Sequence, residues 1–314
     1  MKTINDNKTL HKIIKYYYID SLTQREIAEK LNISRIKVIR YLNYAKEHSL
    51  IEIKLNIPVK DSFELESAIE KSYPMKECRI VPSFNNDNDF YRYAGVELSD
   101  VLRRVLKKDI YVGISWSQTF RNTLEHIDIG KKIFVNVVPI IGGLELDGAM
   151  TNSNIIAHIF AEKIGGVNYT INIPAVFDSK EAKEIIEEEN HTKKIKELAE
   201  KIEVIMTGIG NIGVDSTALR SGYFTSEEIS YLNSLGIHGI INLSFIDENG
   251  KEVKTDIDNR IVKILPFKNF VEIENVIGIA FGENKVTPIK AALKGRLIKY
   301  LITDEKTAKA LLIK

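Results

Sequence analysis

The stretch that determines how the first part of this chain folds is residues 16–47, YYYIDSLTQREIAEKLNISRIKVIRYLNYAKE. Thr23 is followed three residues later by Glu26, and this pairing is a capping box that predicts the start of a helix. Asn32 supplies a turn, and Ser34 is placed to cap the next helix. With the apolar residues at helical spacing before residue 20, the pattern predicts three short helices.

The third of these helices separates apolar from basic residues. Its expected inward stripe is Val38, Ile39, Leu42 and Ala45, and its expected outer residues are Arg35, Lys37 and Arg40. In a helix-turn-helix the second helix enters the major groove, where Arg can bond guanine while Lys and Ser more often hold phosphates. The residues expected to contact DNA are Thr23, Gln24, Ser34, Arg35, Lys37 and Arg40. The alternative is an amphipathic three-helix cap with a solvated basic face.

The charge distribution agrees with a nucleic-acid contact at one end. The net charge of the 314 residues is only +1. Residues 1–60, however, carry twelve Lys and Arg against six Asp and Glu, and the rest carry 32 basic and 37 acidic residues. A basic head on a mildly acidic body predicts a nucleic-acid contact confined to one end, and the helix-turn-helix pattern makes double-stranded DNA the expected partner.

Length and composition indicate a globular protein of about two domains. Hydrophobic residues make up 44% of the chain and charged residues 28%, with one cysteine, Cys78. A single cysteine excludes an internal disulfide framework and favours a reducing compartment. No apolar run is long enough for a membrane helix, and MKTINDNKTL lacks the apolar segment of a signal peptide. A cytoplasmic protein without membrane contact is therefore expected.

Beyond residue 50 the hydrophobic pattern changes period. Alternating apolar residues predict a strand over 51–57, and residues 61–72 predict a connecting helix. The chain then alternates strands and helices, which predicts an α/β fold with a doubly wound, Rossmann-like sheet. Strands are expected at 78–81, 109–114, 133–140, 167–173, 202–207, 239–245, 275–281 and 298–302. Helices are expected at 90–107, 117–126, 152–163, 179–189, 226–235, 284–294 and 304–312. The expected domains are a DNA-binding domain (1–57), a linker helix (58–75) and an effector and oligomerisation domain (76–314).

Loops after several of these strands are candidates for a ligand site, because ligands of open α/β folds bind at the carboxyl ends of the strands. The segment 113–119, GISWSQT, offers hydroxyls and backbone N–H groups to an anion. A second interpretation is an altered hydrolase nucleophile elbow, because the segment contains G-x-S-x-S. No His and acid partner for the serine can be assigned from the sequence. A capped helix start without a ligand is the third interpretation. The residues expected to bind an effector include Gly113, Ser115, Ser117, Gln118, Thr119, Gly142, Gly143, Gly208, Gly210 and Lys285.

The segment 208–213 matches G-x-G-x-x-G. A dinucleotide site would also need a helix opening at once and an acid ending the next strand, and neither is present. A Gly-rich loop at the sheet edge is favoured, with a plain tight turn or NAD binding as alternatives. The six histidines show no metal-ligand spacing. No metal, no cofactor and no catalytic residue are therefore expected.

The sequence resembles the SorC family of bacterial transcriptional regulators, also called DeoR-type sugar-binding regulators. The resemblance spans nearly the whole chain and rests on residues 16–47, GISWSQT at 113–119, IIGGL at 140–144, TGIGNIG at 207–213, RSGYF at 220–224 and the stretch from 282 to 312. It implies a winged-type helix-turn-helix joined to an effector domain similar to sugar-phosphate isomerases. It also implies a homotetramer, a dimer of dimers, that binds operator DNA and responds to a phosphorylated sugar.

The resemblance also implies roles for particular residues. Ser117, Gln118 and Thr119 would hold the phosphate, Lys285 would lie near the ligand, and Asn152 and Asn154 would lie nearby. Two positions depart from the family pattern. Ile141 stands where many members have Lys or Arg, which excludes a Schiff-base lysine there, and Ile240 stands where many have Asp.

The leading hypothesis is a DNA-binding transcriptional regulator controlled by a small metabolite, namely a phosphorylated sugar or polyol. One alternative is an enzyme of sugar-phosphate or acyl metabolism that carries a regulatory DNA-binding head. Another is a regulator whose C-terminal domain serves only for oligomerisation.

Overall fold

The computed structural model describes residues 4–51, 60–143, 152–212, 216 and 224–313. The chain divides into two compact units, Met1–Lys60 and Asp61–Lys314. The strand expected over 51–57 lies, apart from Ile51, outside the described residues.

Within residues 4–51, the first unit forms three helices, α1 (Ile4–Tyr18), α2 (Gln24–Leu31) and α3 (Arg35–Glu47). The predicted capping box is confirmed, since Thr23 and Glu26 exchange hydrogen bonds at the start of α2. Asn32 ends α2 in the left-handed conformation, and the Ser34 side chain accepts from the backbone of Lys37 at the start of α3. A small core holds the helices together; its fully buried members are Ile13, Ile27 and Val38.

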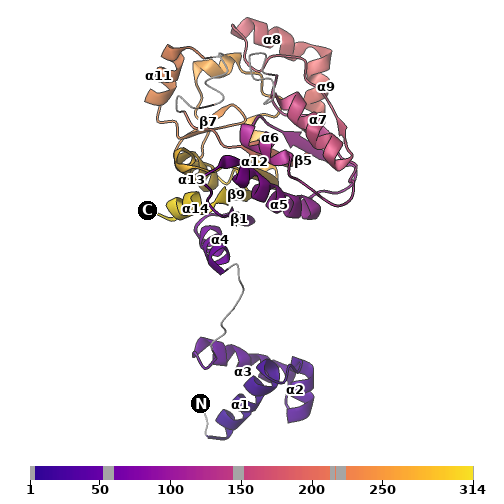
Figure 1. Ribbon diagram of the computed structural model, residues 1–314, viewed down its shortest axis with the longest axis vertical. Helices are drawn as coiled ribbons and strands as arrows, with labels where there is room; N and C mark the ends of the chain where they lie inside the picture. Colours follow the sequence, from indigo (N-terminus) through magenta and orange to yellow (C-terminus); the bar gives the residue numbers. More distant parts are fainter. Residues whose placement is uncertain (1–3, 52–59, 144–151, 213–215, 217–223, 314) are drawn as a thin grey trace. The chain divides into compact units, whose positions relative to one another are not determined.

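The second unit is built on a seven-stranded parallel sheet with the strand order β1-β9-β8-β5-β2-β3-β4. Its helices and strands are coloured from purple to yellow in Figure 1. The strands are β1 (Glu77–Val81), β2 (Tyr111–Ile114), β3 (Asn136–Pro139), β4 (Val167–Asn168), β5 (Ile202–Gly208), β8 (Asn275–Ile279) and β9 (Tyr300–Asp304). The strand predicted over 167–173 is therefore much shorter than expected.

The α-helices of this unit are α4 (Lys60–Ser72), α5 (Asp87–Val105), α6 (Gln118–Leu124), α7 (Ser153–Ile164), α8 (Lys180–Glu188), α9 (Asn190–Ala199), α11 (Ser226–Ser234), α12 (Phe267–Glu272), α13 (Val286–Lys294) and α14 (Glu305–Leu312). The unit also has two short 3₁₀ helices among its described residues, η2 (Asp256–Arg260) and η3 (Glu283–Lys285). The second of them directly precedes α13. Helices α9 and α12 were not predicted as separate elements.

Successive residues of the central strands enter two different apolar cores. Val204 and Met206 of β5 pack with α5, α6 and α7, whereas Ile205 packs with α9, α13 and α14. Because neighbouring strand residues point to opposite faces, both faces of the sheet are covered by helices. Burial on both faces explains why the strands are nearly continuous apolar runs in the sequence.

One predicted strand is wrong. Residues 239–245 form no single strand of the main sheet but part of an antiparallel hairpin, β6 (Gly239–Ile241) and β7 (Ser244–Ile246). Asn242 and Leu243 turn the chain between them with φ of 49° and 54°. Positive φ at both central residues is the geometry of a two-residue type I′ turn. The hairpin packs with Ile141 and Ile261 in a third apolar cluster.

Helix α4 is attached to the edge of the sheet by two carboxylates. Strand β1 is an edge strand, and its backbone N–H groups at Cys78 and Ile80 donate to Glu70 and Glu66 at 2.9 and 2.8 Å. Burial raises the pKa of Glu66, although the Ile80 N–H and Arg79 act in the opposite direction. These side chains occupy N–H groups that an edge strand would otherwise offer to another chain.

We expect Glu66→Ala to lower the free energy of unfolding by about 1–3 kcal/mol, because the Ile80 N–H loses its acceptor. Glu66→Gln should retain the bond through its amide oxygen. The raised pKa means that native stability falls as pH rises through the pKa of Glu66, and Glu66→Gln should lack this decline. Denaturant titrations between about pH 4 and pH 8 measure both effects. Glu64→Ala, an exposed change on the same helix, is the control, and an equal loss in that variant would contradict the assignment.

Candidate functional site

The first candidate site is the exposed surface of α3. Val38, Leu42 and Ala45 are buried as predicted, while Ile39 is only half-buried. Of the predicted outer residues, Arg35 and Arg40 are exposed, but Lys37 is half-buried and lies 5.7 Å from the Tyr41 ring. Ser34, at the N-cap, and Thr23, at the N-cap of α2, are also exposed.

Two predicted DNA contacts touch each other across the two helices. The Arg35 Nε donates to the Gln24 Oε1 at 3.4 Å, joining the first residue of α3 to the first residue of α2. Gln24 can thereby orient Arg35. The sequence pattern missed Ile36, whose side chain is 78% exposed in the same helical turn as Arg35.

The second candidate site is a pocket in the larger unit, where the sheet order reverses. From β2 the chain proceeds outwards through β3 to β4 and returns with β5 on the other side of β2. The connections that follow β2 and β5 therefore begin side by side at the carboxyl ends of adjacent strands and then lead in opposite directions along the sheet. This is the switch point where open α/β sheets bind ligands.

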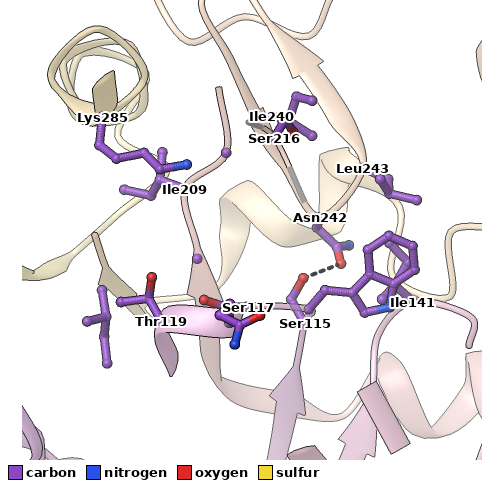
Figure 2. Close-up of a pocket in the computed structure, with 15 residues that line it drawn as sticks. Ser115, Ser117, Thr119, Ile141, Ile209, Ser216, Ile240, Asn242, Leu243 and Lys285 are labelled. Carbon is purple, nitrogen blue, oxygen red and sulfur yellow. Dashed lines mark hydrogen bonds between the residues drawn. The ribbon is translucent and has the colours of Figure 1, made fainter. Parts of the chain in front are cut away.

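A pocket of about 100 Å³ lies at this point (Figure 2). Its lining residues are Ser115, Trp116, Ser117, Gln118, Thr119, Ile141, Gly208, Ile209, Gly210, Ser216, Ile240, Asn242, Leu243, Ile279 and Lys285. The structure thus brings seven of the predicted effector residues to one pocket: Ser115, Ser117, Gln118, Thr119, Gly208, Gly210 and Lys285.

Apart from Trp116 and the two glycines, the more accessible lining residues are polar. Gln118 is exposed, and Ser117, Thr119 and Lys285 are half-buried. The Ser117 Oγ caps α6 by accepting from the Phe120 N–H at 3.0 Å, which leaves its own O–H able to donate. Lys285 extends into the pocket from the other side (Figure 2). Its Nζ lies 3.5 Å from the Asn211 Oδ1. Together these residues can offer hydroxyl, amide and ammonium donors to an anion.

The buried lining residues are mostly apolar. Ile141, Ile240 and Leu243 are at most 4% exposed. The buried polar lining residues are Ser115, Ser216 and Asn242. The Ser115 Oγ donates to the Asn242 Oδ1 at 3.2 Å (Figure 2). The Asn242 amide in turn donates to the Leu265 carbonyl at 3.4 Å. The β6–β7 turn is therefore joined to the end of β2, and its side chains complete the pocket floor.

Five predicted effector residues do not line this pocket. Gly113 lies in β2, where a Cβ would meet Ile140 at 2.9 Å, and Gly142 packs against the backbone of Pro174 and Ala175. The Gly142 carbonyl accepts from the Trp116 indole at 3.0 Å. Gly143, Asn152 and Asn154 make backbone hydrogen bonds: Gly143 with Ile173 and Ala175, Asn152 as the N-cap of α7, and Asn154 with both backbone groups of Ile171.

The pocket offers few side chains for acid–base or metal chemistry. Among the described residues, the pocket lining contains no His, Asp or Glu to act as an acid or base. Across the same part of the chain, no cluster of His, Cys, Asp and Glu could hold a metal ion. Within the described ranges, no helix is long and apolar enough to cross a membrane.

A largely buried ion cluster lies on the segment that pairs with Ile141 beside the pocket floor. The Lys263 Nζ lies 3.0 Å from the Glu252 Oε1 and 2.7 Å from the Asp258 Oδ1, and these side chains are 13%, 14% and 11% exposed. Burial alone would raise the pKa of Glu252, but Lys254 and Lys263 lower it overall. Lys263 also forms a backbone bridge with Ile141, which holds the cluster next to the pocket.

Comparison with protein families gives a match over most of the chain. Residues 57–313 match the family described as "Putative sugar-binding domain". The deoxyribonucleoside regulator of Bacillus subtilis is 30% identical over 302 residues, covering 95% of each chain. The sorbitol operon regulator of Klebsiella pneumoniae is 28% identical over 318 residues, covering 99% of this chain and all of the relative.

Comparison with solved structures also finds transcriptional regulators. The crystal structure of the full-length sorbitol operon regulator SorC from Klebsiella pneumoniae superposes with a TM-score of 0.76 at 27% identity, covering 99% of this chain and 100% of that one. A probable sor operon regulator from Shigella flexneri gives a TM-score of 0.74 at 25% identity over 81% of this chain and 100% of that one. The parallel seven-stranded architecture is thus shared with these regulators.

We expect Lys263→Met to lower the free energy of unfolding by about 3 kcal/mol at neutral pH, because the largely buried Asp258 carboxylate loses its Lys263 ion pair and Glu252 keeps only the exposed Lys254. The pKa of Glu252 is depressed in the native state, so the stability it provides is present above its unfolded pKa and is lost as pH falls through its folded pKa. The cost of Lys263→Met should therefore shrink below about pH 4.

Lys254→Met is the matched control, since Lys254 pairs with the same Glu252 but is 68% exposed. It should cost less than about 1 kcal/mol. Chemical denaturation of the full chain measures both variants. Equal losses would show that the cluster does not behave as a buried ion pair.

Proposed function

The chain belongs to the SorC family of transcriptional regulators, and we propose that it binds operator DNA through α2 and α3 and a phosphorylated sugar or polyol through the pocket at the switch point. It is a DNA-binding regulator controlled by a small metabolite. The observation that carries the effector proposal is the pocket itself, which combines hydroxyl, amide and ammonium groups at the carboxyl ends of β2 and β5.

In the first unit, α2 and α3 form a helix-turn-helix whose second helix enters the major groove. Between Ser34 and Lys46 the sequence has four positive charges and no acid. Phosphate neutralisation by Lys37 and Arg40 supplies affinity, and Arg35, oriented by Gln24, reads base edges. Thr23 and Ser34 hold phosphates.

In the second unit, the effector phosphate binds to Ser117, Gln118, Thr119 and Lys285. Its carbon skeleton then lies towards the buried floor of Ile141, Ile240 and Leu243. Gly208 and Gly210 allow the β5 loop to lie close to the ligand, because a Cβ on Gly208 would meet the Ser117 Oγ at 2.5 Å. The pocket lining has no acid–base pair among the described residues, so binding without turnover is the proposed role.

The protein acts as a homo-oligomer, a dimer of dimers, whose two-fold symmetry matches a palindromic operator. The effector acts by binding one arrangement of the subunits more tightly than another, and the spacing of the DNA-binding units changes with it.

We expect DNA affinity to fall steeply with added salt, and Lys37→Ala to weaken binding to all sequences while reducing the salt slope by about 1. Arg35→Ala should instead relax the choice of base at one position, at a cost of about 1–3 kcal/mol on the preferred sequence. Fluorescence anisotropy at several salt concentrations measures these changes. Lys12→Ala, an exposed lysine on α1, is the control, and a flat salt profile would contradict the proposal.

We expect Lys285→Met to weaken binding of a sugar phosphate by about 10- to 100-fold, because a charge-assisted bond contributes about 1.5–3 kcal/mol. Isothermal titration of the full chain with pentose, hexose and polyol phosphates measures the change. The unphosphorylated sugars should bind both proteins weakly and alike.

Lys294→Met, at the exposed far end of helix α13, whose N-cap is Lys285, should leave affinity unchanged. Equal affinity of the native protein for a sugar and its phosphate would place the phosphate site elsewhere.

A further inference from the structure

The exposed face of α3 has an aliphatic side chain at its centre. Ile36 is 78% exposed, the largest exposed fraction among the large hydrophobic side chains of the described residues. It occupies the second position of the helix, one residue after Arg35.

Helical geometry places Ile36 directly opposite the core. At 100° per residue, the buried Val38, Leu42 and Ala45 define one side of α3. Ile36 and Arg40 point away from that side and are neighbours, because residues four apart lie above one another on a helix. Arg35 lies beside them towards α2, where it bonds Gln24.

The surroundings of Ile36 favour DNA over a protein partner. Its neighbours Arg35 and Arg40 are exposed cations, and no acid occurs from Ser34 to Lys46. A single isoleucine among cations is too small a patch for a stable protein interface. Cations bring phosphates to this face, and the residues at the start of such a helix meet base edges.

We propose that Ile36 is a specificity-determining residue that contacts the 5-methyl group of a thymine in the major groove. This inference rests on the proposed DNA binding by α3. Each base pair presents donors and acceptors in the major groove, and the thymine methyl is the apolar group among them. An isoleucine at the centre of the contacting face therefore selects thymine, while Arg35 and Arg40 take polar positions on either side.

The test replaces the methyl group without changing any hydrogen bond. Preferred DNA is first selected from a random pool with the full chain, and each thymine of the selected site is then replaced singly by deoxyuridine. For the native protein, one position in each half-site should show about three- to ten-fold weaker binding, as expected for one or two buried methyl groups.

Ile36→Ala should lose the same factor on thymine DNA and be indifferent to deoxyuridine at that position. Ile19→Ala, which changes a 73% exposed isoleucine of the same unit, should keep the native sensitivity to the methyl group. Because Ile36 is exposed, Ile36→Ala should melt at the native temperature, which separates a lost contact from a lost fold.

Two results would overturn the inference. Selected DNA that tolerates deoxyuridine at every position would show that no thymine methyl is read. Ile36→Ala that retains the native sensitivity to deoxyuridine would assign the methyl contact to another residue. In both cases the proposed DNA binding would stand, whereas a pool that enriches no sequence would overturn that proposal and this inference together.

Discussion

The close approach of the loops after β2 and β5 is the constraint on which the effector pocket depends. Strands β2 and β5 are hydrogen-bonded neighbours, and a Cβ on Gly208 would stand 2.5 Å from the Ser117 Oγ. Only a residue without a side chain allows the two loops to share one space. The Ser115–Asn242 bond then attaches the β6–β7 turn over the same space and supplies its apolar floor.

The framework of the larger unit, which carries the pocket, is firmly held together. Core side chains cover both faces of the sheet, and Glu66 and Glu70 bind α4 to the edge strand β1. The chain that leads to the first unit therefore leaves from a helix fixed to this sheet.

The sequence predicted the features that depend on local chemistry and missed those that depend on tertiary packing. The caps at Thr23 and Ser34 follow from side chains that reach their own helix. The β6–β7 turn was missed because Asn242-Leu243 lacks the glycine typical of such turns, and buried apolar residues on both sides resemble one strand. The loop residues converge on one pocket, but Asn152 and Asn154 fold into backbone hydrogen bonds that no pattern indicates. The pattern also missed Ile36, which is 78% exposed on α3, while Lys37, predicted on the outer face, is half-buried.

The most direct test of a metabolite-controlled regulator is the anisotropy of DNA from upstream of its own gene, titrated with the full chain in the presence and absence of sugar and polyol phosphates. We predict specific binding whose affinity one of these phosphates changes by about 5- to 150-fold, the range typical of coupling between two sites. Specific binding that is indifferent to every phosphate would contradict the effector assignment. Absence of specific binding would contradict the account as a whole.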